Sequence, residues 1–179
     1  IIRDAEHCLS ARVIRHVLGT MEMRYKVKIY MPSGSSFLTE LDGNFNLARN
    51  FKVSEIANKK ATEEVKLELW PESIVAIEML QDMRDIYGAM IINSAYRTKT
   101  YNKQIGGDAN SAHMHCCAFD WARTGDDAAK RKAIANSWKT ICKKRGIIGA
   151  INYYSWGYHL EAYSDEWYGS KSFIIRNKL

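Results

Sequence analysis

Hydrophobic positions in the first fifty residues change from a helical to an alternating spacing. Residues 3–18 carry apolar side chains three to four positions apart, which predicts an amphipathic helix that ends at Gly19. Residues 23–31 alternate and are rich in β-forming side chains, and residues 37–41 can pair back across a Pro-Ser-Gly-Ser-Ser turn. No motif that carries chemistry is recognisable in this part of the sequence. We interpret residues 1–49 as a small α/β appendage that serves docking or assembly with a partner.

From residue 50 onward, short apolar strands are interleaved with amphipathic helices. One long helix is expected to begin at Pro71, which suits a first helical position, and to end at Gly88. The remaining pattern predicts a short strand or turn leading into a helix over 51–57, a polar loop, a buried strand over 89–93, a short helix over 98–105, a helix from Thr124 or Asp126 to Arg145, strands over 115–121, 147–154 and 158–162, and an edge strand over 173–176. This mixture predicts an α+β fold in residues 50–179 rather than an alternating parallel one.

The composition is that of a globular domain with a positive net charge. The 179 residues are 46% hydrophobic and 26% charged, which suits one domain with a proper core. A net charge of +6 favours polyanions, but both basic clusters fall on one predicted helix, where a solvated face explains them. No helix-turn-helix or aromatic ribonucleoprotein motif is present, which argues against a nucleic-acid-binding protein.

The sequence contains neither a membrane-spanning segment nor a targeting signal that we can identify. No apolar run approaches the roughly 20 residues needed to cross a bilayer, so no membrane span is expected. Charged residues interrupt any apolar region at the start of the chain, so no signal peptide is expected there. The chain opens with Ile1, and we interpret it as a trimmed piece of a longer protein.

The four cysteines argue against a structural zinc ribbon or finger, because none of them forms a C-x2-C pair. The adjacent Cys116 and Cys117 would point to opposite faces of a strand and could not readily bond to each other. We therefore expect buried free thiols.

Residues suited to metal chemistry occur in the segment 93–121 and again near residue 159. His113 begins a His-x6-Asp spacing that ends at Asp120, and His159 stands in an apolar strand. Two histidines and an aspartate are ligand types of a catalytic zinc that keeps one coordination position open. Each residue alone also fits a hydrogen-bonded structural role, so that alternative stays open. His115 can share a face with His113 and is the rival ligand.

Glu161 and Arg97 are the candidate catalytic groups beside these ligands. Positions i and i+2 of a strand share a face, so Glu161 points where His159 points and is our candidate general base. The alternative for Glu161 is a solvent-facing residue at a strand end. Arg97 presents a fork of donors suited to a carboxylate or an oxyanion, and its alternative is a surface salt bridge.

The segments SAYRTKTYNKQIGGDANSAHMHCCAFD and YYSWGYHLE resemble the D-alanyl-D-alanine carboxypeptidase family of zinc peptidases. The family pattern is S-G-Y-R-S/T, Y-N, G-G, N-S-x-H, A-x-D and a final H-x-D/E. The resemblance covers about residues 50–162 and implies the fold shared by these peptidases and the hedgehog signalling domain, which is a small antiparallel sheet flanked by helices. It further implies Zn²⁺ held by His113, Asp120 and His159, a substrate-polarising Arg97, and a site-lining hydroxyl from Ser111.

The chain departs from the family pattern at several positions. Some branches place a glutamate three residues before the last histidine, where this chain has Trp156, so Glu161 is the acid left for the role of base. Cys116 and Cys117 replace the usual glycine and basic residue, and Phe119 fills a place that is commonly smaller. These changes leave the ligands intact and alter the shape of the pocket.

The resemblance implies a zinc-dependent peptidase that hydrolyses stem or cross-link peptides of peptidoglycan, as a D,D-carboxypeptidase or an endopeptidase. The expected site of action is the bacterial cell wall, for a bacterial enzyme or for a phage lysis or tail module. The alternative is a non-catalytic zinc-binding domain of the same fold that binds walls or serves as a structural part.

Overall fold

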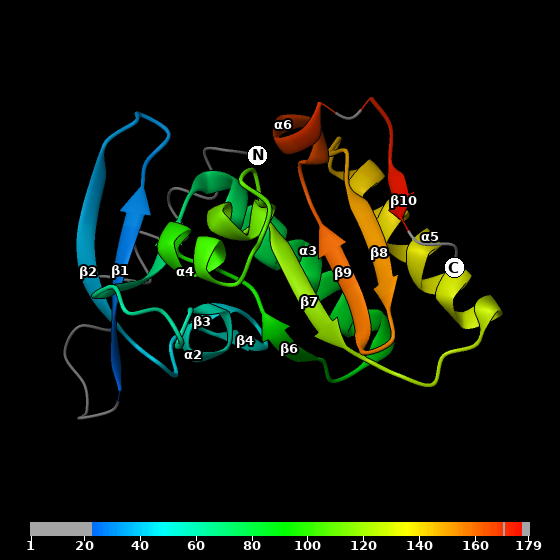
Figure 1. Ribbon diagram of the computed structural model, residues 1–179, viewed down its shortest axis with the longest axis horizontal. Coiled ribbons are helices and arrows are strands. Elements are labelled where there is room, and N and C mark those ends of the chain that lie inside the picture. Colours follow the sequence, from blue (N-terminus) through cyan, green and yellow to red (C-terminus); the bar gives the residue numbers. More distant parts are fainter. Residues whose placement is uncertain (1–22, 170, 177–179) are drawn as a thin grey trace.

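The computed structural model describes residues 23–169 and 171–176, and Figure 1 shows how their helices and strands are arranged. The helix predicted over 3–18 and Cys8 lie outside the described residues. None of the helices that the structure describes is both long enough and apolar enough to cross a membrane.

A three-stranded sheet combines the predicted hairpin with one strand that the sequence pattern did not predict. The hairpin strands β1 (Arg24–Tyr30) and β2 (Ser36–Asp42) pair antiparallel. Strand β5 (Val65–Leu69) pairs parallel with β1, so the polar loop expected after residue 57 is wrong for this segment. The two charged residues of this short strand disfavour strand formation, but pairing with β1 and burial of Leu67 and Leu69 stabilise it. The division of the chain at residue 49 stays a prediction, but β1 and β5 pair across it.

A short segment after this hairpin is joined by a hydrogen bond to the chain just before Arg97. Strands β3 (Asn46–Ala48) and β4 (Phe51–Lys52) pair antiparallel and lead into helix α2 (Val53–Ile56). The backbone amide of Tyr96 donates to the carbonyl of Ile56 at 3.1 Å. This hydrogen bond fixes α2 beside the chain that carries Arg97.

A five-stranded sheet carries the candidate site. Its order is β10-β8-β9-β7-β6, with β10 parallel to β8 and the other pairs antiparallel. Its strands are β6 (Ile91–Ser94), β7 (Ala118–Ala122), β8 (Ala150–Tyr154), β9 (Gly157–Glu161) and β10 (Ile174–Arg176). The predicted α+β fold is confirmed. The strand expected over 89–93 is present as β6, but its expected burial is wrong, because β6 lies at the sheet edge and Ile91 is 70% exposed.

Two long helices, α3 (Pro71–Tyr87) and α5 (Ala128–Lys144), cover one face of the five-stranded sheet (Figure 1). α3 begins at Pro71 and is followed by Gly88, as predicted. α5 is capped by Asp127, whose side chain accepts from the amide of Lys130, one residue beyond the later of the two predicted caps. The core side chains Trp121, Trp138 and Tyr158 are buried. Three short helical segments, α4 (Lys99–Gln104), η1 (Ala112–His115) and α6 (Ser164–Tyr168), complete the fold.

Polar side chains form one line across the opposite face of the sheet. Trp121 contacts Tyr87 of α3 with ring centroids 5.8 Å apart, so the preceding residue of β7 points away from the helices. Directly opposed residues of neighbouring strands share a face. The strand register places in one row, from β6 to β10, Ser94, Asp120, His159, Asn152 and Arg176. This polar row, on an otherwise largely apolar sheet, locates the candidate site.

Gly157 begins β9 at a point where the backbone of β7 approaches closely. Its φ is 147°, and an added Cβ would lie 2.0 Å from the carbonyl oxygen of Trp121. Gly157→Ala is therefore expected to lower the free energy of unfolding by about 2 kcal/mol, measured by urea denaturation. Gly125→Ala is the control, because its φ is 83° with no atom within 4 Å of an added Cβ, and it should cost only about 1 kcal/mol. Equal losses of unfolding free energy in the two variants would contradict the expectation that the β7 backbone leaves no room for a Cβ at residue 157.

Candidate metal centre

His113 is held with one ring nitrogen fixed on the backbone and the other facing the polar row. It lies in η1, a tight turn that replaces the first part of the strand predicted over 115–121, and β7 starts only at Ala118. Its Nδ1 lies 2.6 Å from the carbonyl oxygen of Ala95. A carbonyl only accepts, so Nδ1 carries the hydrogen and Nε2 of the neutral ring carries a lone pair. Burial lowers the pKa of His113, which favours the neutral ring.

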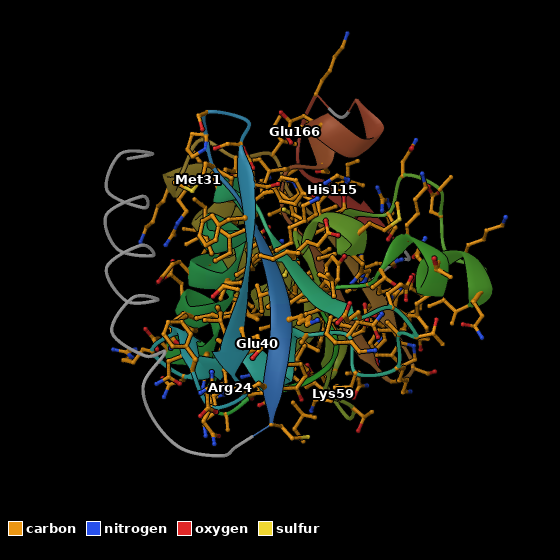
Figure 2. The ribbon with its side chains drawn as sticks, turned by 90° about the vertical axis from the view of Figure 1, so that its left-hand side faces the viewer. Arg24, Met31, Glu40, Lys59, His115 and Glu166 are labelled. Carbon is orange, nitrogen blue, oxygen red and sulfur yellow. The ribbon has the colours of Figure 1, made fainter. Side chains whose placement is uncertain are left out.

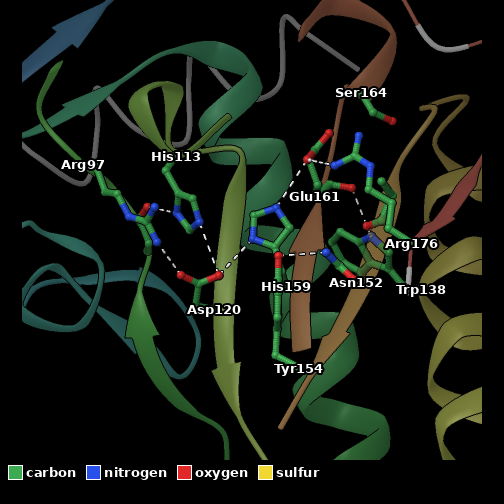
Figure 3. Close-up of polar contacts among 12 residues, drawn as sticks. Arg97, His113, Asp120, Trp138, Asn152, Tyr154, His159, Glu161, Ser164 and Arg176 are labelled. Carbon is green, nitrogen blue, oxygen red and sulfur yellow. Dashed lines mark hydrogen bonds and ion pairs between the residues drawn. The ribbon is translucent and has the colours of Figure 1, made fainter. Parts of the chain in front are cut away.

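Asp120 lies between the two histidines (Figure 3). Its Oδ1 is 3.3 Å from His113 Nε2 and 2.9 Å from His159 Nδ1. Burial alone would raise the pKa of the Asp120 carboxyl, but the neighbouring imidazoles of His113 and His159 outweigh it and hold the pKa well below its usual range. For His159, burial would lower the pKa, but the neighbouring carboxylates Asp120 and Glu161 raise it. The carboxylate of Asp120 is therefore ionised and available as a ligand.

The three side chains fit a zinc ion. One ligand atom from each of His113, Asp120 and His159 lies within 4.8 Å of the others. Ligands at about 2.1 Å from a tetrahedral zinc are about 3.4 Å apart, close to the 3.3 Å between His113 Nε2 and Asp120 Oδ1. His113 Nε2 is buried without a hydrogen-bond partner among the described residues, and its lone pair faces an ionised oxygen. A cation placed between His113 Nε2 and Asp120 Oδ1 would accept electron density from both atoms. A donor set of two imidazoles and one carboxylate suits zinc.

Arg97 holds the second oxygen of Asp120. Its Nη2 lies 2.5 Å from Asp120 Oδ2, and its Nε donates to Ser94 Oγ at 2.8 Å. The backbone amide of Arg97 also donates to the carbonyl of His113 at 3.0 Å, which joins this loop to η1. Arg97 thus fixes which carboxylate oxygen of Asp120 faces the two histidines. Its expected contact with substrate stays a prediction.

Glu161 shares the face of His159, as the strand spacing predicts, but contacts the other end of the imidazole. Its Oε2 lies 3.3 Å from His159 Nε2, whereas Nδ1 faces Asp120. The Glu161 side chain is fully buried. The glutamate therefore stands behind the ring, on the side away from Asp120 (Figure 3). This placement suits a carboxylate that holds the Nε2 hydrogen of a metal-binding histidine.

Two residues of the polar row were missed by the sequence reasoning. Arg176, on the last strand, has its Nη1 3.5 Å from Glu161 Oε2 and so partners this buried carboxylate. Asn152 is paired in register with His159 and donates to the hydroxyl of Tyr154 at 2.8 Å. The available signal was a single amide within the apolar run 147–154. No sequence signal marks Arg176, because its position depends on a strand pairing between distant segments.

The other candidates lie outside the cluster of possible ligands. His115 faces Trp70 instead, with ring centroids 5.0 Å apart, and lies toward the side of the molecule seen in Figure 2. Ser111 is buried immediately before η1, and its site-lining role stays a prediction. Trp156 is 37% exposed and stacks on Tyr154. The predicted buried free thiols are confirmed for Cys116, Cys117 and Cys142.

Zinc binding should be visible as added thermal stability. A ligand that binds only the folded state at a hundred times its Kd adds about 2.7 kcal/mol, which for a chain of this size raises Tm by roughly 5–10 °C. We expect this shift when zinc is added to chelator-treated protein, measured by calorimetry. Magnesium is the control, because it prefers six oxygen ligands. An equal shift with both ions, or none with zinc, would contradict the assigned ligand set.

Comparison with known families matches residues 49–154 to the family described as Peptidase M15. The matched segment contains Arg97, His113 and Asp120, and it ends before His159. No curated protein matches the chain.

Proposed function

Because the chain belongs to the peptidase M15 family, whose members are zinc-dependent, we propose that it hydrolyses peptide bonds in the stem or cross-link peptides of peptidoglycan. The observation that carries the proposal is the convergence of His113 Nε2, Asp120 Oδ1 and His159 Nδ1 on one point. Three protein ligands leave a tetrahedral zinc one position for water or substrate, which is the arrangement of catalytic rather than structural zinc sites. Zinc, when bound there, lowers the pKa of water toward 7 and polarises a carbonyl.

The protein's own part is to hold three ligand atoms with their lone pairs inward. Ala95 fixes the tautomer of His113 through Nδ1. Arg97 fixes Asp120 through Oδ2 and leaves Oδ1 toward the histidines. Glu161 fixes His159 through Nε2 and leaves Nδ1 toward Asp120. Each ligand is thus oriented by one further contact, which reduces the reorganisation needed to bind the ion.

We assign Glu161 a positioning role, in place of the general base expected from its spacing. A base must reach the proton that it removes, at about 2.6–3.2 Å or through one water. The carboxylate of Glu161 lies behind the His159 ring and is fully buried. Figure 3 shows Tyr154 next to Asn152, which donates to its hydroxyl, so the hydroxyl of Tyr154 keeps its own hydrogen free for donation. Tyr154 is the proton donor that this arrangement favours.

The substrate assignment follows the family and the charge of the chain. The M15 family includes D-alanyl-D-alanine carboxypeptidases. A net charge of +6 favours the anionic polymers of a bacterial cell wall, where we place the site of action, in a bacterium or in a phage lysis or tail module.

The test is a digestion of purified muropeptides by protein loaded with one zinc per chain. Mass spectrometry distinguishes release of a terminal D-alanine from cleavage of cross-links. We expect one of these products, and its loss when the protein is treated with a chelator. Bound zinc without cleavage of any wall preparation would overturn the peptidase proposal and favour a structural zinc domain.

A further inference from the structure

A cavity of about 270 Å³ opens beside the metal ligands, at the β6 edge of the sheet. Residues 55–60 form one wall and residues 92–97 form the other. The hydrogen bond from the amide of Tyr96 to the carbonyl of Ile56 pins these walls together. Arg97 lines the cavity and also contacts Asp120, so the cavity lies one side chain away from the metal centre.

The charged groups of the cavity are mainly cationic. Lys59, Lys60 and Arg97 line it together with a single acid, Glu55. One oxygen of Glu55 already accepts from the backbone amide of Lys52 at 2.9 Å. The cavity therefore favours an anion.

Asn58 adds a fixed hydrogen-bond donor to this lining. It is only 6% exposed, and its Oδ1 accepts from the amide of Lys60 at 3.2 Å, which orients the side-chain amide. Its Nδ2 is buried and has no hydrogen-bond partner among the described residues. A buried donor without a partner is destabilising, and a ligand oxygen would supply the partner that it lacks.

The rest of the lining suits a short aliphatic stem. Ile92, Ala95 and Ile105 contribute apolar surface, while Lys59 lies at the molecular surface (Figure 2). A cavity of this size is below the usual range for whole ligands and suits one amino-acid side chain.

We propose that this cavity is a subsite that binds a carboxylate on the second residue before the scissile bond of the peptide substrate. The inference rests on the proposed peptidase function. Asn58 donates to the carboxylate, Lys59 and Lys60 attract it, and Arg97 separates it from the metal ligands. The subsite selects peptides with a free acid over their amides.

The experiment uses zinc-loaded protein and two acetylated peptides ending in D-alanyl-D-alanine. They differ only in carrying glutamate or glutamine immediately before that dipeptide. Binding is followed by NMR titration of the backbone amides in every variant, with the side-chain amide of Asn58 as an additional reporter in the unchanged protein, and cleavage is followed separately. We expect about tenfold tighter binding of the glutamate peptide, equivalent to one charge-assisted hydrogen bond.

Variants test which residues create the preference. Asn58→Asp keeps the acceptor for Lys60 and adds a negative charge, so it should abolish the preference, as should the double variant Lys59→Gln/Lys60→Gln. The control Lys143→Gln/Lys144→Gln removes an adjacent pair of exposed lysines from the end of α5 and should leave it intact.

The outcomes separate this inference from the proposed function. Equal affinity for both peptides, or loss of preference in the control variant as well, would overturn the subsite whether or not either peptide is cleaved. Preferential binding without cleavage would leave the subsite standing and count against the peptidase activity.

Discussion

Replacement of Asp120 by asparagine is expected to remove zinc binding and hydrolysis together. Asparagine keeps the size of the side chain but withdraws the negative charge that the two histidines and Arg97 share. Loss of an outer partner of a metal ligand typically costs 10–100-fold in affinity, so loss of this direct ligand should exceed about a hundredfold. Hydrolysis should fall to background, because the remaining two ligands cannot retain the ion.

The measurement is zinc affinity by chelator competition, together with muropeptide release. Asp126→Asn is the matched control, since Asp126 is likewise an acid paired with an arginine, at 2.6 Å from Arg123, and takes no part in the ligand cluster. We expect the control to bind zinc as the unchanged protein does. Full zinc occupancy in Asp120→Asn would contradict the assigned ligand.

The group of possible metal ligands could be predicted because their residue types are few and their local spacing is informative. His113 and Asp120 lie seven positions apart on a turn entering a strand, and the structure brings them together with His159. The ring nitrogens that converge could not be predicted. They depend on the carbonyl of Ala95 and on Glu161, which are positioned by the pairing of β6, β7 and β9.

The polar row illustrates the same limit at the level of the fold. Alternation along each strand predicts which residues share a face of that strand, but the register between strands decides which residues are neighbours. Asn152 and Arg176 meet His159 and Glu161 only because β8 pairs with both β9 and β10. The strand β5 was missed for a related reason. Its five residues include two charges, and pairing with β1 supplies the stabilisation that its own pattern does not predict.

Glu161→Gln should distinguish a positioning residue from a general base. If Glu161 holds the Nε2 hydrogen of His159, the variant loses a charge-assisted contact, and zinc affinity should fall by about 10–100-fold. The turnover of the zinc-saturated variant should then stay close to that of the unchanged protein. A general base would give the opposite result, with unchanged zinc affinity and turnover lowered by about 10²–10⁴-fold at full occupancy. Both quantities are measured on the same preparation, by chelator competition and by muropeptide release at saturating zinc.

Arg176 supplies an independent check on this interpretation, because it pairs with Glu161 and is not itself one of the possible metal ligands. Arg176→Gln leaves the buried carboxylate of Glu161 with His159 as its other ion-pair partner among the described residues, and we expect zinc affinity to fall. Arg145→Gln is the matched control, since Arg145 is 29% exposed against 34% for Arg176 and pairs with Asp82 away from the site. We expect zinc affinity to fall with Arg176→Gln but not with Arg145→Gln, while the zinc-free proteins have equal Tm. This result would show that β10 contributes to zinc binding through Arg176. Equal zinc affinity in the unchanged protein, Arg176→Gln and Arg145→Gln would mean that the contact of Glu161 with His159 Nε2 does not contribute to zinc binding. Glu161 would then be a candidate for proton transfer instead.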